Sequence, residues 1–288
     1  MQRAMIIGAA GLLGQYMRSS AVERGLDVTA TFNRTRPEQR EVPQVHLDIT
    51  DADAVDTVIA KAAPDVVFLP SALTSVDYCE THPGEAWAVN AEGKNVGARL
   101  FYVSTDYVFN GGKGEKYYEF DSPDPISVYA QTKLEGERLT LDANRRNIVA
   151  RVSVLYGWNR VSDKTNFVTW VMNELRQGRE VKLFGDQNVT PTYAPNAADV
   201  MLTMAEENGA GLYHVAGPNC LSRYEMGLRI AEAFGLNASL CKKVRTEDVP
   251  LPAKRGRVTC LDINKMQAEF NTTMSSFAAG LADMRTTE

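Results

Sequence analysis

The chain has 288 residues, of which 44% are hydrophobic and 23% are charged, and its formal net charge is -5. This length allows one large domain or two closely packed domains, and the composition is that of an ordinary globular protein. The negative net charge argues against nucleic acid as a partner. No apolar run has the roughly 20 residues that a helix needs to cross a bilayer, so we expect a cytoplasmic protein with no membrane partner.

Short apolar segments rich in β-branched residues recur along the chain and predict buried strands. They lie at residues 4–9, 27–32, 44–49, 65–71, 99–105, 147–157 and 211–217. Several are apolar at nearly every position, as in strands that helices cover on both faces. Helical patterns alternate with them, first at 12–25 and then at 51–64. The alternation predicts an α/β fold of the Rossmann type, with a doubly wound parallel sheet.

The character of the chain changes after Gly157, where longer polar segments separate helices expected at 166–178 and 222–235. We interpret residues 1–157 as a Rossmann domain. Residues 158–288 then form a smaller, partly interleaved substrate domain, from which about 196–217 returns to the first domain.

The segment between Asn90 and the strand expected at Arg99 is short. Its eight residues read AEGKNVGA, whereas a crossover helix with its turn needs a dozen or more. Either this part of the chain is naturally shortened or residues are missing from it.

Four cysteines, Cys79, Cys220, Cys241 and Cys260, lie far apart in the sequence. They form no CxxC pair and have no histidine cluster nearby, so the spacing indicates neither a zinc site nor a disulfide framework. We expect reduced thiols and no bound metal.

Three glycines, Gly8, Gly11 and Gly14, separate the first predicted strand from the first predicted helix in the segment GAAGLLG. Such glycines permit a tight turn, the approach of a pyrophosphate to backbone N–H groups, and close packing of helix on sheet. The pattern predicts a dinucleotide site. The alternative is a plain strand–turn–helix connection.

The end of the second predicted strand bears on the choice of dinucleotide. An acidic residue there is typical of NAD enzymes, whereas an arginine accommodates the 2′-phosphate of NADP. This chain has Asn33 followed by Arg34 and Arg36, which favours NADP(H). A solvated basic loop that includes Arg40 is the alternative. Asp48 and Ile49 follow on the third strand, where the adenine would lie.

Tyr129 and Lys133 are four positions apart in a predicted helix, so both project from one face. A neighbouring ammonium stabilises phenolate, so we expect a lowered pKa for Tyr129 and a role in proton transfer. Thr105 ends the fifth predicted strand, at the sheet edge where ligands bind in α/β folds. It could donate a hydrogen bond to a substrate carbonyl, or it could be an ordinary strand-end hydroxyl.

In combination, these segments resemble the extended branch of the short-chain dehydrogenase/reductase superfamily, and the whole chain resembles the dTDP-4-dehydrorhamnose reductase family. The motifs occur in the family's order: GAAGLLG, LDITD, VDYCE, YVSTDYVFNG, YAQTKLEGE, RVSVLYG, DQNVTPTYA and RGRVTCLD. The resemblance implies NADPH-dependent reduction of the 4-keto group of a nucleotide-linked deoxysugar.

The resemblance also implies roles for particular residues. Thr105, Tyr129 and Lys133 would be catalytic, and Lys133 would also bind the nicotinamide ribose. Cofactor contacts would come from Gly8, Gly11, Leu12, Leu13, Gly14, Asp48, Ile49, Ser71, Ala72 and Thr74. For the sugar nucleotide we name Val76, Tyr107 and Arg257, each of which could equally be an ordinary surface or packing residue. A homodimer is left open.

Two other functions remain open from the sequence. The family also resembles the regulatory subunit of methionine adenosyltransferase, which keeps the dinucleotide fold while serving a catalytic partner. A sugar-nucleotide epimerase of the same extended branch would cycle hydride internally and retain NAD. The lack of an acidic residue after the second strand disfavours the epimerase.

Overall fold

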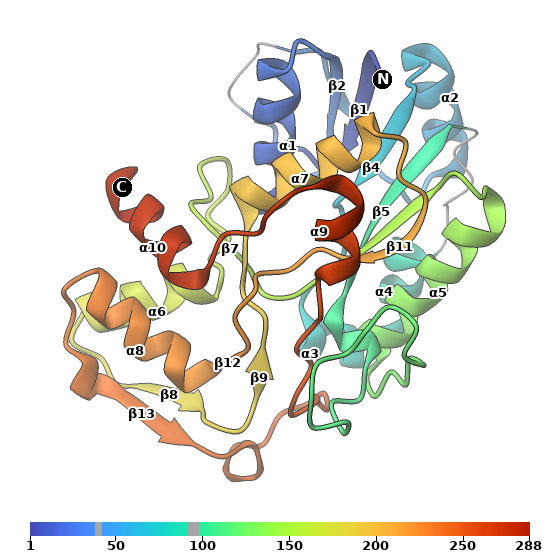
Figure 1. Ribbon diagram of the computed structural model, residues 1–288. Helices are drawn as coiled ribbons and strands as arrows, with labels where there is room; N and C mark the ends of the chain where they lie inside the picture. The colour runs from blue at the N-terminus through green and yellow to red at the C-terminus, as the bar shows by residue number, and fades with distance from the viewer. Residues whose placement is uncertain (38–41, 92–97) are drawn as a thin grey trace.

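The structure is a computed structural model that describes residues 1–37, 42–91 and 98–288. A seven-stranded sheet lies at its centre, in the order β11-β6-β5-β4-β1-β2-β3. The strands are β1 (Arg3–Ile7), β2 (Asp27–Phe32), β3 (Gln44–His46), β4 (Val66–Leu69), β5 (Arg99–Thr105), β6 (Ile148–Val152) and β11 (Gly211–His214). Every neighbouring pair is parallel. The predicted Rossmann-type sheet is therefore confirmed (Figure 1).

Both faces of this sheet are buried, and successive strand residues alternate between them. In β4, Phe68 belongs to one apolar cluster whereas Val67 and Leu69 belong to another. Helices α1 (Leu12–Glu23) and α7 (Ala194–Glu206) supply the first cluster and pack on each other. Helix α2 (Ala52–Ala62) supplies the second, and α5 (Val128–Ala143) packs on β5 and β6. Burial on both faces explains why the strand sequences are almost continuously apolar.

The segment predicted as one strand at 147–157 forms two. Strand β6 ends at Val152 and the short β7 (Leu155–Tyr156) follows, because Val154 between them has a φ of 42°. A β-branched residue rarely adopts this left-handed conformation, so the apolar run gave no sign of the break.

A second, smaller core lies beside the sheet. Helices α6 (Phe167–Arg176), α8 (Arg223–Ala233) and α10 (Phe277–Thr286) surround it, and α9 (Asn264–Phe270) packs near β11 instead. Its short strand pairs are β8 (Val181–Phe184) with β13 (Cys241–Val244), β9 (Asn188–Val189) with β12 (Leu221–Ser222), and β7 with β10 (Thr192–Tyr193). In the described residues there are also 3-10 turns: η1 (Asp106–Val108), η2 (Ala238–Leu240) and η3 (Thr246–Asp248).

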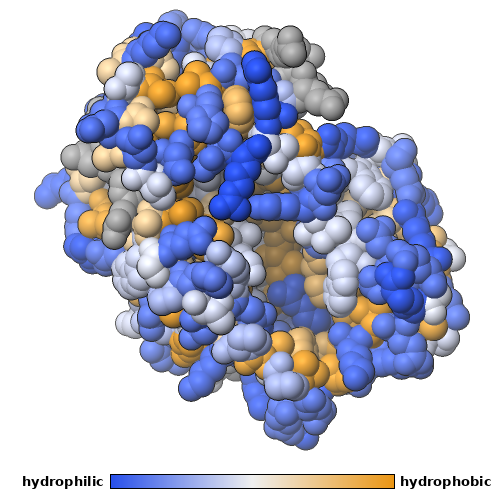
Figure 2. Space-filling model, turned by 180° about the vertical axis from the view of Figure 1, so that it is seen from behind, coloured by the Kyte–Doolittle hydropathy of each residue, from blue (hydrophilic) through white to orange (hydrophobic). Residues whose placement is uncertain are grey.

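The two cores are interleaved along the chain. After β10, helix α7 and strand β11 return to the central sheet, and α8 then leads back to the smaller core (Figure 1). Figure 2 shows a hollow between the two parts, with mainly hydrophobic residues on the inner surface that is visible and hydrophilic residues around the rim. Within the described residues, no helix is long and apolar enough to cross a bilayer.

The crossover from β4 to β5 contains two short helices, α3 (Val76–Thr81) and α4 (Pro83–Asn90). Both precede the short segment noted in the sequence. Residues 92–97 of that segment lie outside the described residues, so the proposed shortening stays a prediction.

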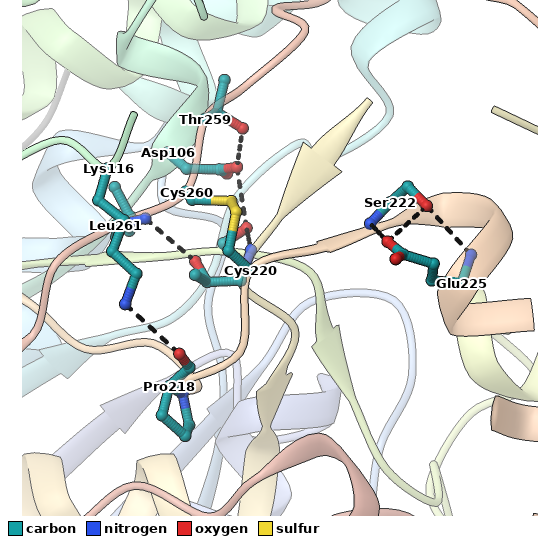
Figure 3. The surroundings of a disulfide bond; sticks show 11 residues. Asp106, Lys116, Pro218, Cys220, Ser222, Glu225, Thr259, Cys260 and Leu261 are labelled. Atoms are coloured by element: carbon teal, nitrogen blue, oxygen red, sulfur yellow. Dashed lines mark hydrogen bonds between the residues drawn. A yellow bond between two sulfur atoms is a disulfide. The ribbon is translucent and has the colours of Figure 1, made fainter. Parts of the chain in front are cut away.

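One disulfide joins Cys220 to Cys260, which are 40 positions apart in sequence and have Cα atoms 5.6 Å apart (Figure 3). The expectation of reduced thiols is therefore wrong for this pair. Sequence spacing gave no sign of it, because the pairing depends on the tertiary contact between two distant loops. Cys79 and Cys241 are buried free thiols.

Candidate active site

The glycine turn lies between β1 and α1 and leaves no room for side chains. A Cβ atom on Gly14 would lie 2.2 Å from the carbonyl oxygen of Gly8, and one on Gly8 would lie 2.8 Å from Cβ of Ser71. Gly8 also has a φ of 94°. Gly11 caps α1 with no side-chain hydrogen bond, and the first turn of the helix carries no acidic residue. Its backbone N–H groups are therefore suited to a pyrophosphate.

The next residues of the turn divide between surface and core. Leu12 is half-buried where α1 begins, whereas Leu13 is 4% exposed and belongs to the first apolar cluster. Only the backbone of Leu13 is thus placed to serve a ligand.

The carboxyl ends of β2 and β3 carry the residues predicted for the adenosine end of the dinucleotide. Asn33 and Arg34 are exposed, and Arg34 has a loose ion pair with Glu85 at 3.8 Å. The Asp48 carboxylate accepts hydrogen bonds from the backbone N–H of Thr50 (3.0 Å) and from its hydroxyl (2.8 Å). These bonds, with one from Asn33, lower the pKa of Asp48.

The loop after β4 contains Ser71, Ala72 and Thr74, which are half-buried or exposed. Asn90, a residue that sequence reasoning missed, holds this loop in place. Its side-chain oxygen accepts from the Leu73 N–H (2.8 Å), and its amide nitrogen donates to the Leu73 carbonyl (3.2 Å). The loop therefore lies against the glycine turn, where Ser71 touches Gly8.

Helix α5 brings Tyr129 and Lys133 to the carboxyl edge of the sheet. Ser127 caps the helix by accepting from the Ala130 N–H, which is why the helix begins at Val128. Lys133 is 1% exposed, and its Nζ donates to the Val103 carbonyl at 2.7 Å. The same ammonium lies 4.0 Å from the centre of the Tyr102 ring.

The pKa of Tyr129 is raised, not lowered as the sequence led us to expect. The main cause is burial, which penalises the charged phenolate, and a hydrogen bond with Thr105 offsets only part of it. The Lys133 ammonium meanwhile lies against β5 through the Val103 carbonyl. The Tyr129 phenol is therefore protonated at neutral pH.

Thr105 ends β5 and begins a buried hydroxyl–carboxylate cluster. Its Oγ1 accepts from the Tyr107 N–H and donates to Oδ1 of Asp106, both at 3.2 Å. Asp106 also accepts from the hydroxyls of Ser153 (2.8 Å) and Thr259 (2.7 Å). Burial raises the pKa of Asp106, while these hydrogen bonds lower it in part. The cluster fixes the Thr105 hydroxyl beside Tyr129.

Glu137 holds α5 against the sheet, and the sequence analysis did not single it out. It follows Tyr129 and Lys133 at a further interval of four, so all three residues share the buried face of α5. Its carboxylate accepts two hydrogen bonds from Arg151 on β6 and one from Ser104 on β5. The spacing of Tyr129, Lys133 and Glu137 at i, i+4 and i+8 could have predicted from the sequence that Glu137 is buried on the same helix face.

The three residues named for the sugar nucleotide are placed differently. Val76 begins α3 and packs in the small apolar cluster that contains Tyr129, and the Tyr107 ring meets Tyr129 edge-on at 5.9 Å. Arg257 instead faces solvent, with Asp186 and Glu247 the nearest acids at 3.9 and 3.7 Å. The structure does not bring it to Tyr129.

Arg255, and not Arg257, is the arginine that contacts Tyr107. Its guanidinium donates to Asp77 of α3 at 2.7 Å and has a side-chain hydrogen bond with Tyr107. The Asp77 carboxylate also accepts from the Ala253 N–H at 3.1 Å. A segment of the C-terminal part thus contacts α3 and Tyr107.

Comparison with known proteins agrees with this geometry. The family model described as "RmlD substrate binding domain" matches residues 2–288. The chain belongs to the RmlD substrate binding domain family. The predicted resemblance is thereby confirmed.

Relatives of this RmlD family protein cover almost its whole length. It is 32% identical to the dTDP-4-dehydrorhamnose reductase of Aggregatibacter actinomycetemcomitans, with 99% of both chains covered. It is 33% identical to methionine adenosyltransferase 2 subunit beta of Xenopus tropicalis, with 86% of this chain and 77% of the relative covered. A crystal structure of dTDP-4-dehydrorhamnose reductase from Bacillus anthracis in complex with NADP superposes with a TM-score of 0.88 at 26% identity, covering 100% of both chains.

Proposed function

We propose that this RmlD family protein is an NADP-dependent oxidoreductase that reduces the 4-keto group of a nucleotide-linked deoxysugar. One observation carries the proposal: Thr105, Tyr129 and Lys133 lie together at the carboxyl edge of the sheet that also holds the glycine turn. The relative named dTDP-4-dehydrorhamnose reductase and the related structure with NADP support it.

The dinucleotide fits the residues present. Gly8 and Gly14 form a turn that any Cβ would fill, and α1 points its uncapped N-terminus at it. Arg34, exposed at the end of β2, would meet the 2′-phosphate, and Asp48 and Ile49 would border the adenine. Bound NADPH supplies the hydride.

The chain's own residues would manage the proton. Tyr129 donates its proton to the carbonyl oxygen, since its phenol is protonated at neutral pH. Thr105 would orient the carbonyl by turning its single O–H from Asp106 to the substrate oxygen. Lys133, whose Nζ donates to the Val103 carbonyl in the structure, would bind the nicotinamide ribose and stabilise charge on the phenol oxygen once the cofactor is bound.

The substrate would lie in the hollow between the two parts of the molecule (Figure 2). Val76 and Tyr107 border Tyr129, and Arg255 contacts Tyr107; all three would contact the sugar or its diphosphate. Arg257 could reach the nucleotide only from the exposed rim. We assign residues 1–157, with about 196–217, to cofactor binding and the rest of 158–288 to the substrate. A cytoplasmic location and a homodimeric assembly belong to the same proposal.

A regulatory subunit is the second candidate, because the similarity to methionine adenosyltransferase 2 subunit beta covers most of the chain. Such a protein would bind NADP(H) without turning it over. An epimerase, by contrast, would retain NAD through purification.

The test is to mix purified protein with NADPH and dTDP-4-keto-6-deoxymannose and follow the absorbance of the reduced nicotinamide. The proposal expects substrate-dependent oxidation, faster with NADPH than with NADH. Tight NADPH binding with no oxidation would favour the regulatory subunit, and tightly bound NAD in the purified protein would favour the epimerase.

A further inference from the structure

The two sulfur-bearing residues of the disulfide differ in accessibility. Cys220 is an exposed residue just before β12, whereas Cys260 is fully buried. A small thiol can therefore approach this bond only from the Cys220 side. Thiol–disulfide exchange depends on such access as well as on the attacking thiolate.

Cys260 is joined to the active site through its chain neighbour. Thr259 donates a hydrogen bond from Oγ1 to Oδ2 of Asp106 at 2.7 Å, and both side chains lie beside the disulfide in Figure 3. Asp106 in turn accepts from the hydroxyl of the proposed catalytic Thr105. The path from the disulfide to that hydroxyl is thus one peptide unit and two hydrogen bonds.

The disulfide ties the segment that contains Thr259 and Cys260 to Cys220, which lies just before β12 in the smaller core. Noncovalent contacts already hold it elsewhere: the Thr259 N–H donates to the Asn188 carbonyl (3.0 Å), and the Tyr117 N–H donates to the Cys260 carbonyl (2.8 Å). Cys220 lies two residues before Ser222, which caps α8. Breaking the bond would remove the covalent tie between the loop before α8 and the segment that carries Thr259.

We propose that the Cys220–Cys260 disulfide is a thiol-exchange site, at which a dithiol reductant releases Thr259 from Asp106 and so weakens the positioning of Thr105. The effect on catalysis rests on the proposed reductase function; the effect on structure does not.

The exchange balances in two steps. A thiolate of the dithiol attacks Sγ of Cys220, the bond between the two cysteine sulfurs breaks, and Cys260 leaves as a thiolate that takes up a proton. The second thiol of the reductant then displaces Cys220 from the mixed disulfide. Two electrons pass to the protein, which gains two thiols, and the dithiol becomes a cyclic disulfide.

The first experiment counts thiols and needs no activity. Protein denatured without reductant should show the two thiols of Cys79 and Cys241, and four after dithiothreitol. Alkylation of the briefly reduced native protein should label Cys220 before Cys260. Four thiols in air-exposed protein would overturn the proposal.

The second experiment measures hydrogen–deuterium exchange at the Tyr107 N–H, which donates to Thr105 Oγ1. Reduction should speed exchange there, while the core amides of β1 should stay unchanged. Unchanged exchange at Tyr107 would contradict the path through Thr259, whether or not the protein is a reductase.

The third experiment compares kcat in oxidised and reduced protein. Losing a hydrogen bond to a charged group should lower kcat by about tenfold with NADPH affinity unchanged. Thr259→Val should be slow in both states and insensitive to dithiothreitol, whereas the matched control Cys241→Ala should respond as the parent does. If dithiothreitol lowers kcat as much in Thr259→Val as in the parent, the proposed path through Thr259 is refuted. If the parent shows no reductase activity in either state but hydrogen–deuterium exchange at the Tyr107 N–H still speeds up on reduction, the reductase function is refuted and the structural effect is not.

Discussion

Arg151 donates two hydrogen bonds, of 2.9 and 2.7 Å, to the carboxylate of Glu137 in the core below the proposed catalytic residues. Both side chains are almost fully buried, at 3% and 4% exposure. Because Glu137 belongs to the helix that carries Tyr129 and Lys133, this ion pair sets the position of that helix on the sheet.

Glu137→Gln should destabilise the protein, since it leaves the Arg151 guanidinium buried without a counter-charge. Breaking a buried pair from one side costs about 3–5 kcal/mol of unfolding free energy, which urea denaturation would measure. The control is Arg138→Ala on the exposed face of the same helix, whose ion pairs lie in solvent and should contribute little. Equal stability of Glu137→Gln and the parent would show that the pair is not structural.

The rate of reduction should not depend on pH through Tyr129 in the ordinary working range. Burial raises the pKa of its phenol above the usual 10, so the proton donor is present at every lower pH and is lost only above that pKa. The profile of kcat/KM for reduction should therefore have no basic limb between about pH 6 and 9, whereas the reverse reaction, which needs the phenolate, should speed up as pH rises. A basic limb near pH 7 in the parent that Tyr129→Phe abolishes would contradict the raised pKa.

Gly14→Ala should impair dinucleotide binding and folding together. The added methyl would lie 2.2 Å from the Gly8 carbonyl oxygen and 2.9 Å from Cα of Ala9, both backbone atoms that cannot move aside cheaply. We expect the Kd for NADPH to rise at least about tenfold, which corresponds to about 1.4 kcal/mol, as measured by quenching of tryptophan fluorescence.

The matched control is Gly84→Ala in helix α4, where a Cβ would meet nothing within 4 Å. That change should leave NADPH affinity unaltered and raise stability by about 0.5–1 kcal/mol, since glycine is a poor helix former. Similar NADPH affinity in both variants would argue against the glycine turn as the pyrophosphate site.

Arg34→Ala should reduce the preference for NADPH over NADH. Its side chain is 87% exposed, and its ion pair with Glu85 is loose at 3.8 Å, so it is available to a 2′-phosphate. We expect a rise of about tenfold in the Kd for NADPH with little change for NADH. Arg36→Ala is the control, because Arg36 lies against the Phe32 ring and Gln44. If the preference for NADPH over NADH falls in Arg36→Ala and not in Arg34→Ala, Arg36 and not Arg34 binds the 2′-phosphate.

Local patterns were enough to predict the sheet and the glycine turn. Apolar runs mark strands buried on both faces, and the spacing of Tyr129 and Lys133 marks one helical face, because both depend on residues close in sequence. The raised pKa of Tyr129 could not be predicted this way, since it results from burial by the whole fold. The disulfide, the Thr259–Asp106 bond and the Arg255–Asp77 pair join residues 40, 153 and 178 positions apart, and no local signal announces such contacts.

The most direct test of the account is a single turnover. Protein saturated with NADPH is mixed with dTDP-4-keto-6-deoxymannose, and the absorbance of the reduced nicotinamide is followed for the parent and for Tyr129→Phe. The account predicts oxidation of one NADPH per site by the parent and a rate lower by about 100-fold or more in Tyr129→Phe, with NADPH bound equally well by both. Equal rates in the two proteins would contradict the role of Tyr129 as the proton donor.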